Sequence, residues 1–219
     1  MHTLKAIIFD LDGTLIHSAP DLQAAANKML AMYDRPPLDL SVVISFIGNG
    51  VEMLVERSLD ATGGYDAPLK QSALEAFLTF YKENMTTLTR PYPGVVSALQ
   101  TFSDTGIRLG ICTNKPSGPA VEICDRLDLA KFFDVVSGTE AELPRKPDPT
   151  PLLNCIKQLG AAPDEVIYVG DSAVDYQTTV NAAVAFRLFT DGYLNEPLPA
   201  VGEKDRFDDW SAHGIPLTW

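Results

Sequence analysis

The chain is short of cysteines and of positive charges, and each shortage narrows the kind of protein it can be. Its three cysteines, Cys112, Cys124 and Cys155, are scattered without a CxxC pair, which is typical of free thiols in a reducing compartment. Lys and Arg number 17 against 29 Asp and Glu, for a net charge of -12, so we expect no nucleic-acid partner. If the substrate is an anion, a local positive group must hold it, because the overall field of the protein repels it.

The sequence also lacks a long apolar run. No stretch is apolar for 18 residues, so no transmembrane helix is expected. The N-terminal apolar run at 4–9 is too short for a signal peptide and is followed by Asp10 and Asp12. We therefore expect a cytoplasmic protein with no membrane partner, either a monomer or a homodimer.

Short apolar runs alternate with helical patterns over much of the chain. The runs have the continuous apolar character of strands covered on both faces, and they lie at 4–9, 107–112, 133–136, 166–169 and 185–189. Helical patterns lie between them at 95–103, 118–127 and 150–159, the last followed by Gly160 as a candidate C′ glycine. This alternation predicts an α/β fold with a Rossmann-like, doubly wound parallel sheet.

Residues from about 18 to 90 show helical patterns only. Ser18-Ala-Pro-Asp21 predicts a helix start with a serine cap and an acid three residues later. Three helical stretches follow, at 21–32, 51–59 and 69–81. We predict an all-helical domain at 17–90, with three or four helices, inserted between the first and second strands of a Rossmann-like core made of 1–16 and 91–219. The proline-rich segment 195–219 gives no clear pattern.

Carboxylates follow two of the predicted strands. Asp10 and Asp12, two residues apart in an extended segment, point to the same side, and Asp171 follows a different strand. A single Asp at a strand end is usually a turn or helix cap. Three of them at one edge of a parallel sheet, where ligands bind, favour an oxygen-rich cation site suited to Mg²⁺.

Three further polar residues are candidates for the same site, each with a simpler alternative. Thr113 offers a hydroxyl beside a helix N-terminus, where an anion is favoured, although it could merely cap that helix. Lys146 is a point charge suited to phosphate or carboxylate, although alone it reads as a solvated lysine. Asp175, four residues after Asp171, could orient a metal ligand or pair with Lys146, or be an ordinary acid in a first helical turn.

Taken together, these motifs resemble the haloacid dehalogenase superfamily. They are Asp10-Leu-Asp-Gly-Thr14, Thr113, Lys146 and Gly170-Asp-Ser-x-x-Asp175, in the family's order, and the helical insertion looks like the family's C1 cap. The resemblance implies a nucleophilic Asp10 that forms an aspartyl-phosphate. It implies that Asp12 is the general acid and then the base.

The resemblance also assigns the remaining roles. Mg²⁺ would bind the Asp10 carboxylate, the Asp12 backbone carbonyl and Asp171. Thr113 and the Asn114 backbone N–H would hold phosphate oxygens, and Lys146 would balance charge in the transition state. Gly13 would let the backbone turn closely around the site. The acid at position 12 favours phosphoryl transfer over carbon–halogen chemistry, because members acting on carbon–halogen bonds lack it.

Finer features resemble bacterial phosphoglycolate phosphatases and imply a small anionic phosphate ester, 2-phosphoglycolate, as substrate. Gly48, Asn49 and Gly50 would form the substrate loop of the cap, although they could be a plain interhelical turn. His17 occurs in such relatives but could be a local polar contact. Ala183 stands in the segment Ala182-Ala-Val184 where the family usually has Gly, which we expect to change only a turn. Two alternatives stay open: a phosphatase for another ester, such as a sugar phosphate or nucleotide, and a non-catalytic binding protein with the same fold.

Overall fold

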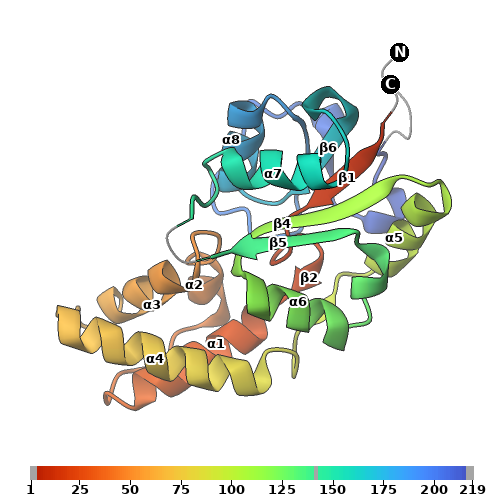
Figure 1. The fold of residues 1–219 in the computed structure, drawn as a ribbon. Coiled ribbons are helices and arrows are strands. Elements are labelled where there is room, and N and C mark those ends of the chain that lie inside the picture. Colours follow the sequence, from red (N-terminus) through yellow and green to blue (C-terminus); the bar gives the residue numbers. More distant parts are fainter. Residues whose placement is uncertain (1–3, 141–142, 216–219) are drawn as a thin grey trace.

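The computed structural model describes residues 4–140 and 143–215, and a parallel sheet lies at its centre (Figure 1). The six strands run in the order β5-β4-β1-β6-β7-β8, and all neighbouring pairs are parallel. They are β1 (Ala6–Phe9), β4 (Arg108–Pro116), β5 (Val135–Thr139), β6 (Val166–Gly170), β7 (Ala185–Phe189) and β8 (Arg206–Phe207). A separate two-stranded antiparallel ribbon joins β2 (Ile16–His17) to β3 (Arg90–Pro91).

Helices cover both faces of the sheet, which explains why β1 is apolar at every position. Ile7 and Phe9 pack with residues of α5 (Val95–Asp104) and α6 (Ser117–Arg126), whereas Ala6 and Ile8 pack with residues of α7 (Thr150–Gln158) and α8 (Ala173–Ala182). Successive side chains of a strand point to opposite faces, so a strand between two helical layers needs apolar residues throughout. The predicted α/β, doubly wound fold class is confirmed.

Two strand boundaries differ from the prediction in a way that matters for the site. The expected strand at 107–112 continues as β4 to Pro116, so Thr113, Asn114 and Lys115 lie on a strand rather than in a loop. The expected strand at 133–136 lies later, at Val135–Thr139. Polar side chains ended the apolar pattern, but the two strands continue side by side, with a register shift between Cys112 and Pro116.

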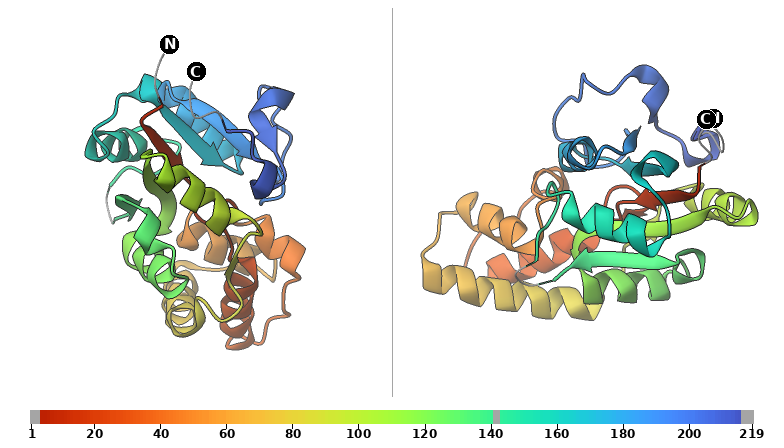
Figure 2. Two further views of the ribbon diagram at one scale, coloured as in Figure 1. Left: turned by 90° about the vertical axis from the view of Figure 1, so that its right-hand side faces the viewer. Right: turned by 45° about the horizontal axis from the view of Figure 1, so that its top comes forward.

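Between β2 and β3 lie four helices, which we call the helical insertion. They are α1 (Ala19–Ala31), α2 (Leu40–Ile44), α3 (Val51–Asp60) and α4 (Ala67–Asn84). Figures 1 and 2 show them as a group beyond the carboxyl ends of β4 and β5. The sequence did not suggest α2, which has five residues and buries only Val43.

The predicted serine cap at the start of the insertion is wrong. The helix begins at Ala19, as expected, but the Ser18 side chain makes no cap hydrogen bond. Asp21 instead accepts from the backbone N–H groups of Leu88 and Thr89 at 2.8–3.0 Å, and from the Thr89 hydroxyl at 2.7 Å. The acid therefore ties the first helix to the segment that leaves the insertion, which is a long-range partner that a local pattern cannot reveal.

The C-terminal segment that gave no pattern contributes the edge strand β8 and a buried tryptophan; positions 216–219 lie outside the described residues. The Trp210 ring lies 5.0–5.9 Å from the rings of Phe9, Phe189 and Phe207, and its indole N–H donates to the Thr14 carbonyl at 3.1 Å. This segment thus packs beneath the turn that follows Asp10.

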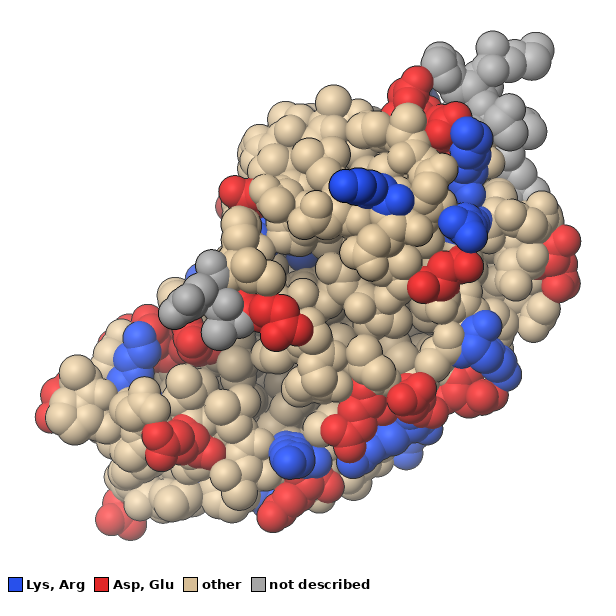
Figure 3. Space-filling view, in the orientation of Figure 1, with Lys and Arg blue, Asp and Glu red and all other residues tan. Residues whose placement is uncertain are grey.

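Charged side chains of both signs are interspersed on the face shown in Figure 3, without a basic patch on that face. Within residues 4–140 and 143–215, none of the helices has the length and apolar character needed to cross a bilayer.

Ala183 occupies a left-handed conformation, with φ 54° and ψ 44°, directly after α8. Its N–H donates to the carbonyls of Thr179 and Val180, which ends the helix as a C′ glycine usually does. The departure from the family's glycine therefore costs backbone strain, because an L-residue with a Cβ is disfavoured there by roughly 1–2 kcal/mol.

We predict that Ala183→Gly stabilises the protein by about 0.5–1 kcal/mol, measured by urea unfolding, since relief of strain exceeds the added freedom of the unfolded chain. Ala182→Gly, inside the helix, is the matched control and should destabilise by a similar amount. An Ala183→Gly protein that unfolds at the same or lower urea concentration than the wild type would contradict this reading.

Candidate active site

Side chains from three strands meet at the carboxyl edge of the sheet. Asp10 follows β1, Asp171 follows β6, and Asp175 lies in the first turn of α8. Each offers a carboxylate oxygen, and these oxygens all lie within 4.8 Å of one another. Thr113, on the extension of β4, faces the same place and is buried. The sequence predicted this convergence, and the structure brings these residues together.

Lys146 lies among these acids. Its Nζ is 2.9 Å from Asp10 Oδ1 and 2.6 Å from Asp175 Oδ1, and it donates to the Tyr168 hydroxyl at 2.8 Å. Its side chain is only 2% exposed, so the alternative of a solvated lysine does not hold. Burial alone would lower the pKa of Lys146, but the charges of Asp10 and Asp175 outweigh it and hold that pKa above its usual range.

The loop that carries Lys146 is fastened by Asn114. The Asn114 side chain accepts from the Lys146 backbone N–H at 2.9 Å and donates to the Lys146 carbonyl at 3.0 Å. It also donates to the Gly48 carbonyl in the helical insertion, at 3.0 Å. Asn114 was predicted for its backbone N–H; its side chain has a positioning role that the sequence did not suggest.

Asp171 and Asp175 are held in different ways. Asp171 accepts from the Thr14 hydroxyl and from the Tyr193 backbone N–H, both at 2.7 Å. Asp175 accepts from the N–H groups of Asp171 and Ser172, at 3.3 and 3.1 Å, and completes a capping box with Ser172. Asp175 therefore pairs with Lys146, bonds to the backbone at Asp171 and also acts as an acid in the first turn of α8, so these alternatives from the sequence occur together.

The buried acids leave this edge short of positive charge. Burial raises the pKa of Asp10 to about 6, although Lys146 opposes the rise. Burial, with the charges of Asp175 and Asp10, raises the pKa of Asp171 well above its usual range. Asp10 Oδ1 lies near Lys146 Nζ but in a direction that makes no hydrogen bond. Clustered, under-compensated hard oxygens fit a divalent metal ion, so this cluster could hold one.

Gly13 allows the close approach that this edge requires. It has φ +87°, and a Cβ added there would lie 2.3 Å from Asp171 Oδ2 and 2.7 Å from the Tyr193 ring. Any side chain there would thus displace Asp171 or Tyr193. This agrees with the role expected for Gly13.

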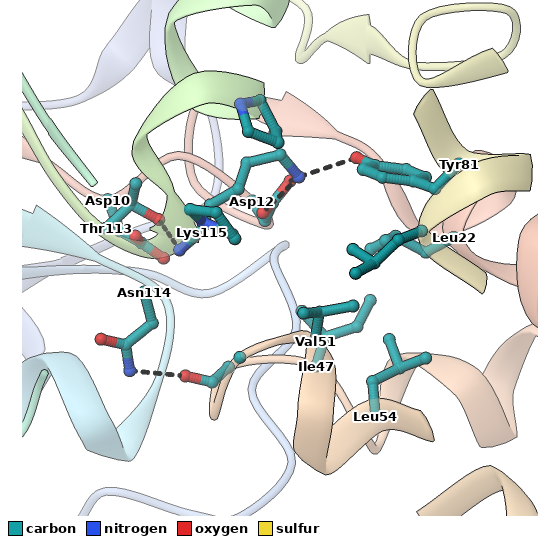
Figure 4. Close-up of a pocket in the computed structure, with 15 residues that line it drawn as sticks. Asp10, Asp12, Leu22, Ile47, Val51, Leu54, Tyr81, Thr113, Asn114 and Lys115 are labelled. Carbon is teal, nitrogen blue, oxygen red and sulfur yellow. Dashed lines mark hydrogen bonds and ion pairs between the residues drawn. The ribbon is translucent and has the colours of Figure 1, made fainter. Parts of the chain in front are cut away.

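A cavity opens above the acids, between the sheet edge and the helical insertion (Figure 4). Asp10, Asp12 and Thr113 line it from the core side. The insertion lines it largely with apolar side chains, namely Leu22, Ile47, Val51, Leu54 and Leu78. A small ligand bound there would have its polar end at Asp10 and its remainder beneath the insertion.

Asp12 and Lys115 form a second ion pair in this cavity, joined by Tyr81 of α4 (Figure 4). Lys115 Nζ lies 2.9 and 3.1 Å from the two Asp12 carboxylate oxygens and donates to the Tyr81 hydroxyl at 2.7 Å. The Asp12 carboxylate is therefore paired with Lys115, whereas the group that the resemblance assigns to a metal is the Asp12 backbone carbonyl. The sequence gave Lys115 no role; the extension of β4 beyond Cys112 carries it to the cavity together with Thr113 and Asn114.

This site geometry can be compared with a family of known proteins. Residues 7–188 match the family described as haloacid dehalogenase-like hydrolase. The chain belongs to this family.

Curated relatives and solved structures agree with that assignment. The chain is 42% identical over 198 residues, 89% of each chain, to a phosphoglycolate phosphatase of Cereibacter sphaeroides. It is 41% identical over 216 residues to one of Rhodospirillum rubrum, covering 96% of this chain and 89% of that protein. A crystal structure of a predicted phosphoglycolate phosphatase from Haemophilus somnus superposes with a TM-score of 0.90 at 29% identity, over 96% of both chains.

The resemblance assigns the loop 48–50 to substrate binding, but only part of this loop lines the cavity. Gly48 and Gly50 line the cavity, with φ 113° and 90°. Asn49 is not among the lining residues, and its side-chain oxygen accepts from Arg57 at 2.9 Å. In this structure the Asn49 side chain therefore contacts Arg57 of the helical insertion and does not line the cavity.

His17 has a partner beside the acid cluster. Its Nδ1 lies 3.0 Å from the Tyr193 hydroxyl, which also accepts from the Ala19 N–H at 2.9 Å. Burial lowers the pKa of His17. Since the Tyr193 N–H donates to Asp171, His17 links the start of the helical insertion to the loop that holds Asp171.

We predict that Lys146→Met lowers the free energy of unfolding by about 3–5 kcal/mol, because it leaves the buried Asp10 and Asp175 without their cation. Urea unfolding at neutral pH measures the loss. Lys157→Met, at an exposed position of α7, is the matched control and should change stability by less than about 0.5 kcal/mol. Equal stability of the two variants would show that Lys146 does not balance these acids.

Proposed function

We propose that this chain is a Mg²⁺-dependent phosphatase that hydrolyses 2-phosphoglycolate to glycolate and phosphate through an aspartyl-phosphate on Asp10. The observation that carries the proposal is the position of Asp10 beneath the cavity, 2.9 Å from the buried Lys146, with Asp12 lining the same cavity. The names of the relatives at about 40% identity support the substrate.

In the first step an Asp10 carboxylate oxygen attacks phosphorus, and the bond from phosphorus to the glycolate oxygen breaks. Asp12 gives a proton to that oxygen as it leaves. Lys146 favours the ionised, nucleophilic form of Asp10 and balances the charge that gathers on the phosphoryl oxygens. The Thr113 hydroxyl binds one of those oxygens.

In the second step Asp12 takes a proton from water, whose oxygen attacks phosphorus and displaces Asp10. Phosphate leaves and the Asp10 carboxylate is restored. The same residue serves as acid and then as base, which requires it to reach both the leaving oxygen and the incoming water on one side of the phosphoryl group.

Mg²⁺, held by Asp10, Asp171 and the Asp12 carbonyl, would supply positive charge that offsets the repulsion between an anionic nucleophile and an anionic substrate. Asp175 would keep Asp171 in place through its bonds to the backbone there.

The helical insertion would act as a cap over the cavity. Its contacts with the core at Asn114 and at Lys115, through Gly48 and Tyr81, support a closed position in which bulk water is excluded during the first step. The linkers of the cap would be the short β2–β3 ribbon and its neighbours.

We predict that a panel of phosphomonoesters gives the highest kcat/KM with 2-phosphoglycolate, by about tenfold or more, equivalent to about 1.4 kcal/mol of transition-state preference. Released phosphate is the readout, and Asp10→Asn is the blank. If another ester gives the highest kcat/KM while activity still requires Asp10, the proposed mechanism is retained and the proposed substrate is wrong. Wild-type protein as inactive as Asp10→Asn across the panel would instead favour a binding protein.

We predict that Mg²⁺ raises the free energy of unfolding of the wild type, by about 2.7 kcal/mol at a concentration of one hundred times its Kd. Asp171→Asn should lose this response, yet be as stable as the wild type in EDTA, because it removes one of three mutually repelling buried acids. The control Asp208→Asn, at an exposed site, should keep the response. A wild type whose unfolding ignores Mg²⁺ would count against the metal site.

A further inference from the structure

Lys115 is the one cation among the described residues that line the cavity. It is 7% exposed, and the second buried lysine, Lys146, is paired with Asp10 and Asp175. The insertion side of the cavity is largely apolar. In a protein of net charge -12, Lys115 is therefore the cationic side chain that a second negative group on a bound phosphate ester would meet among these lining residues.

All three donors of Lys115 are in use in this structure. Two contacts go to the two oxygens of Asp12 and one goes to the Tyr81 hydroxyl. To act as the general acid, Asp12 must carry a proton on one oxygen, and that oxygen cannot keep its full contact with the ammonium, so catalysis as proposed requires Asp12 to release Lys115 at least in part. A buried ammonium without a carboxylate is costly, so another anion must replace Asp12.

The proposed substrate carries such an anion at the right place. In 2-phosphoglycolate one methylene separates the ester oxygen from the carboxylate. With the phosphoryl group at Asp10 and Thr113, the carboxylate lies only a few bonds away, in the same cavity. Thr113 and Lys115 both lie on β4 and both line the cavity.

We propose that Lys115 is a specificity-determining residue that binds the carboxylate of the substrate, which takes the place of Asp12 on the ammonium. This inference rests on the proposed phosphatase activity toward 2-phosphoglycolate. The exchange keeps a carboxylate on Lys115 throughout and frees Asp12 only when a substrate with a carboxylate is present. Tyr81, which holds the third donor from α4, steadies Lys115 when the helical insertion is in the position seen here.

The test compares 2-phosphoglycolate with ethyl phosphate, which has a methyl group in place of the carboxylate. Lys115→Met removes the charge at similar length. We expect it to lower kcat/KM for 2-phosphoglycolate about 10- to 100-fold more than for ethyl phosphate, mostly through KM, since a charge-assisted contact is lost with one substrate only. Lys115→Gln, which keeps a donor for Asp12 and Tyr81, is the second variant should Lys115→Met not fold, and it should show the same selective loss.

Two controls separate binding from positioning. Tyr81→Phe keeps the Lys115 charge and should retain the ratio of the two kcat/KM values, even if both fall. Lys82→Met, at the neighbouring exposed position of α4, should leave both values unchanged.

Equal losses for both substrates in the Lys115 variants would overturn the inference, because Lys115 would then act only by placing Asp12. That result is distinct from failure of the proposed function, which a wild type showing no preference for 2-phosphoglycolate over ethyl phosphate would reveal.

Discussion

The ion pairs of the buried Lys146 with Asp10 and Asp175 are the interaction on which the rest of this site depends. Three carboxylates within 4.8 Å of one another would repel strongly in a dry environment, and a cation among them offsets that repulsion. Lys146 supplies one positive charge, and the pKa values of Asp10 and Asp171 remain raised in spite of it. That remaining deficit is a physical reason for the cluster to take up a divalent cation.

Much of the fold is organised around holding this charge cluster. Asn114 fastens the loop of Lys146, Thr14 and Tyr193 hold Asp171, and Trp210 packs beneath the turn after Asp10. Each contact joins segments far apart in the chain. A cluster of like charges needs such positioning. The electrostatic repulsion between the acids favours moving them apart, so packing and hydrogen bonds around them must offset it.

Local patterns predicted what depends on local physics. Continuous apolar runs predicted β1 and β6, because strands between two helical layers must be apolar on both faces, and strand ends then placed Asp10 and Asp171 at one edge. Distant partners stayed hidden. Asp21 looked like a capping-box acid but binds the backbone at Thr89, and the conformation of Ala183 is set by how α8 ends. Lys115 was passed over since its partners, Asp12 and Tyr81, lie 103 and 34 residues away.

The site thus contains two buried lysines with different neighbours. This difference suggests that the two lysines have different roles. Lys146 faces two acids and a tyrosine inside the core, so its contacts do not depend on the helical insertion. Lys115 faces one acid of the core and one hydroxyl of the insertion, so its surroundings change whenever the insertion moves. A charge that must stay fixed for the reacting phosphoryl group belongs in the first setting. The surroundings of Lys115 suit a charge that distinguishes one ester from another. There a substrate carboxylate can replace the Asp12 carboxylate, so the ammonium always keeps an anionic partner.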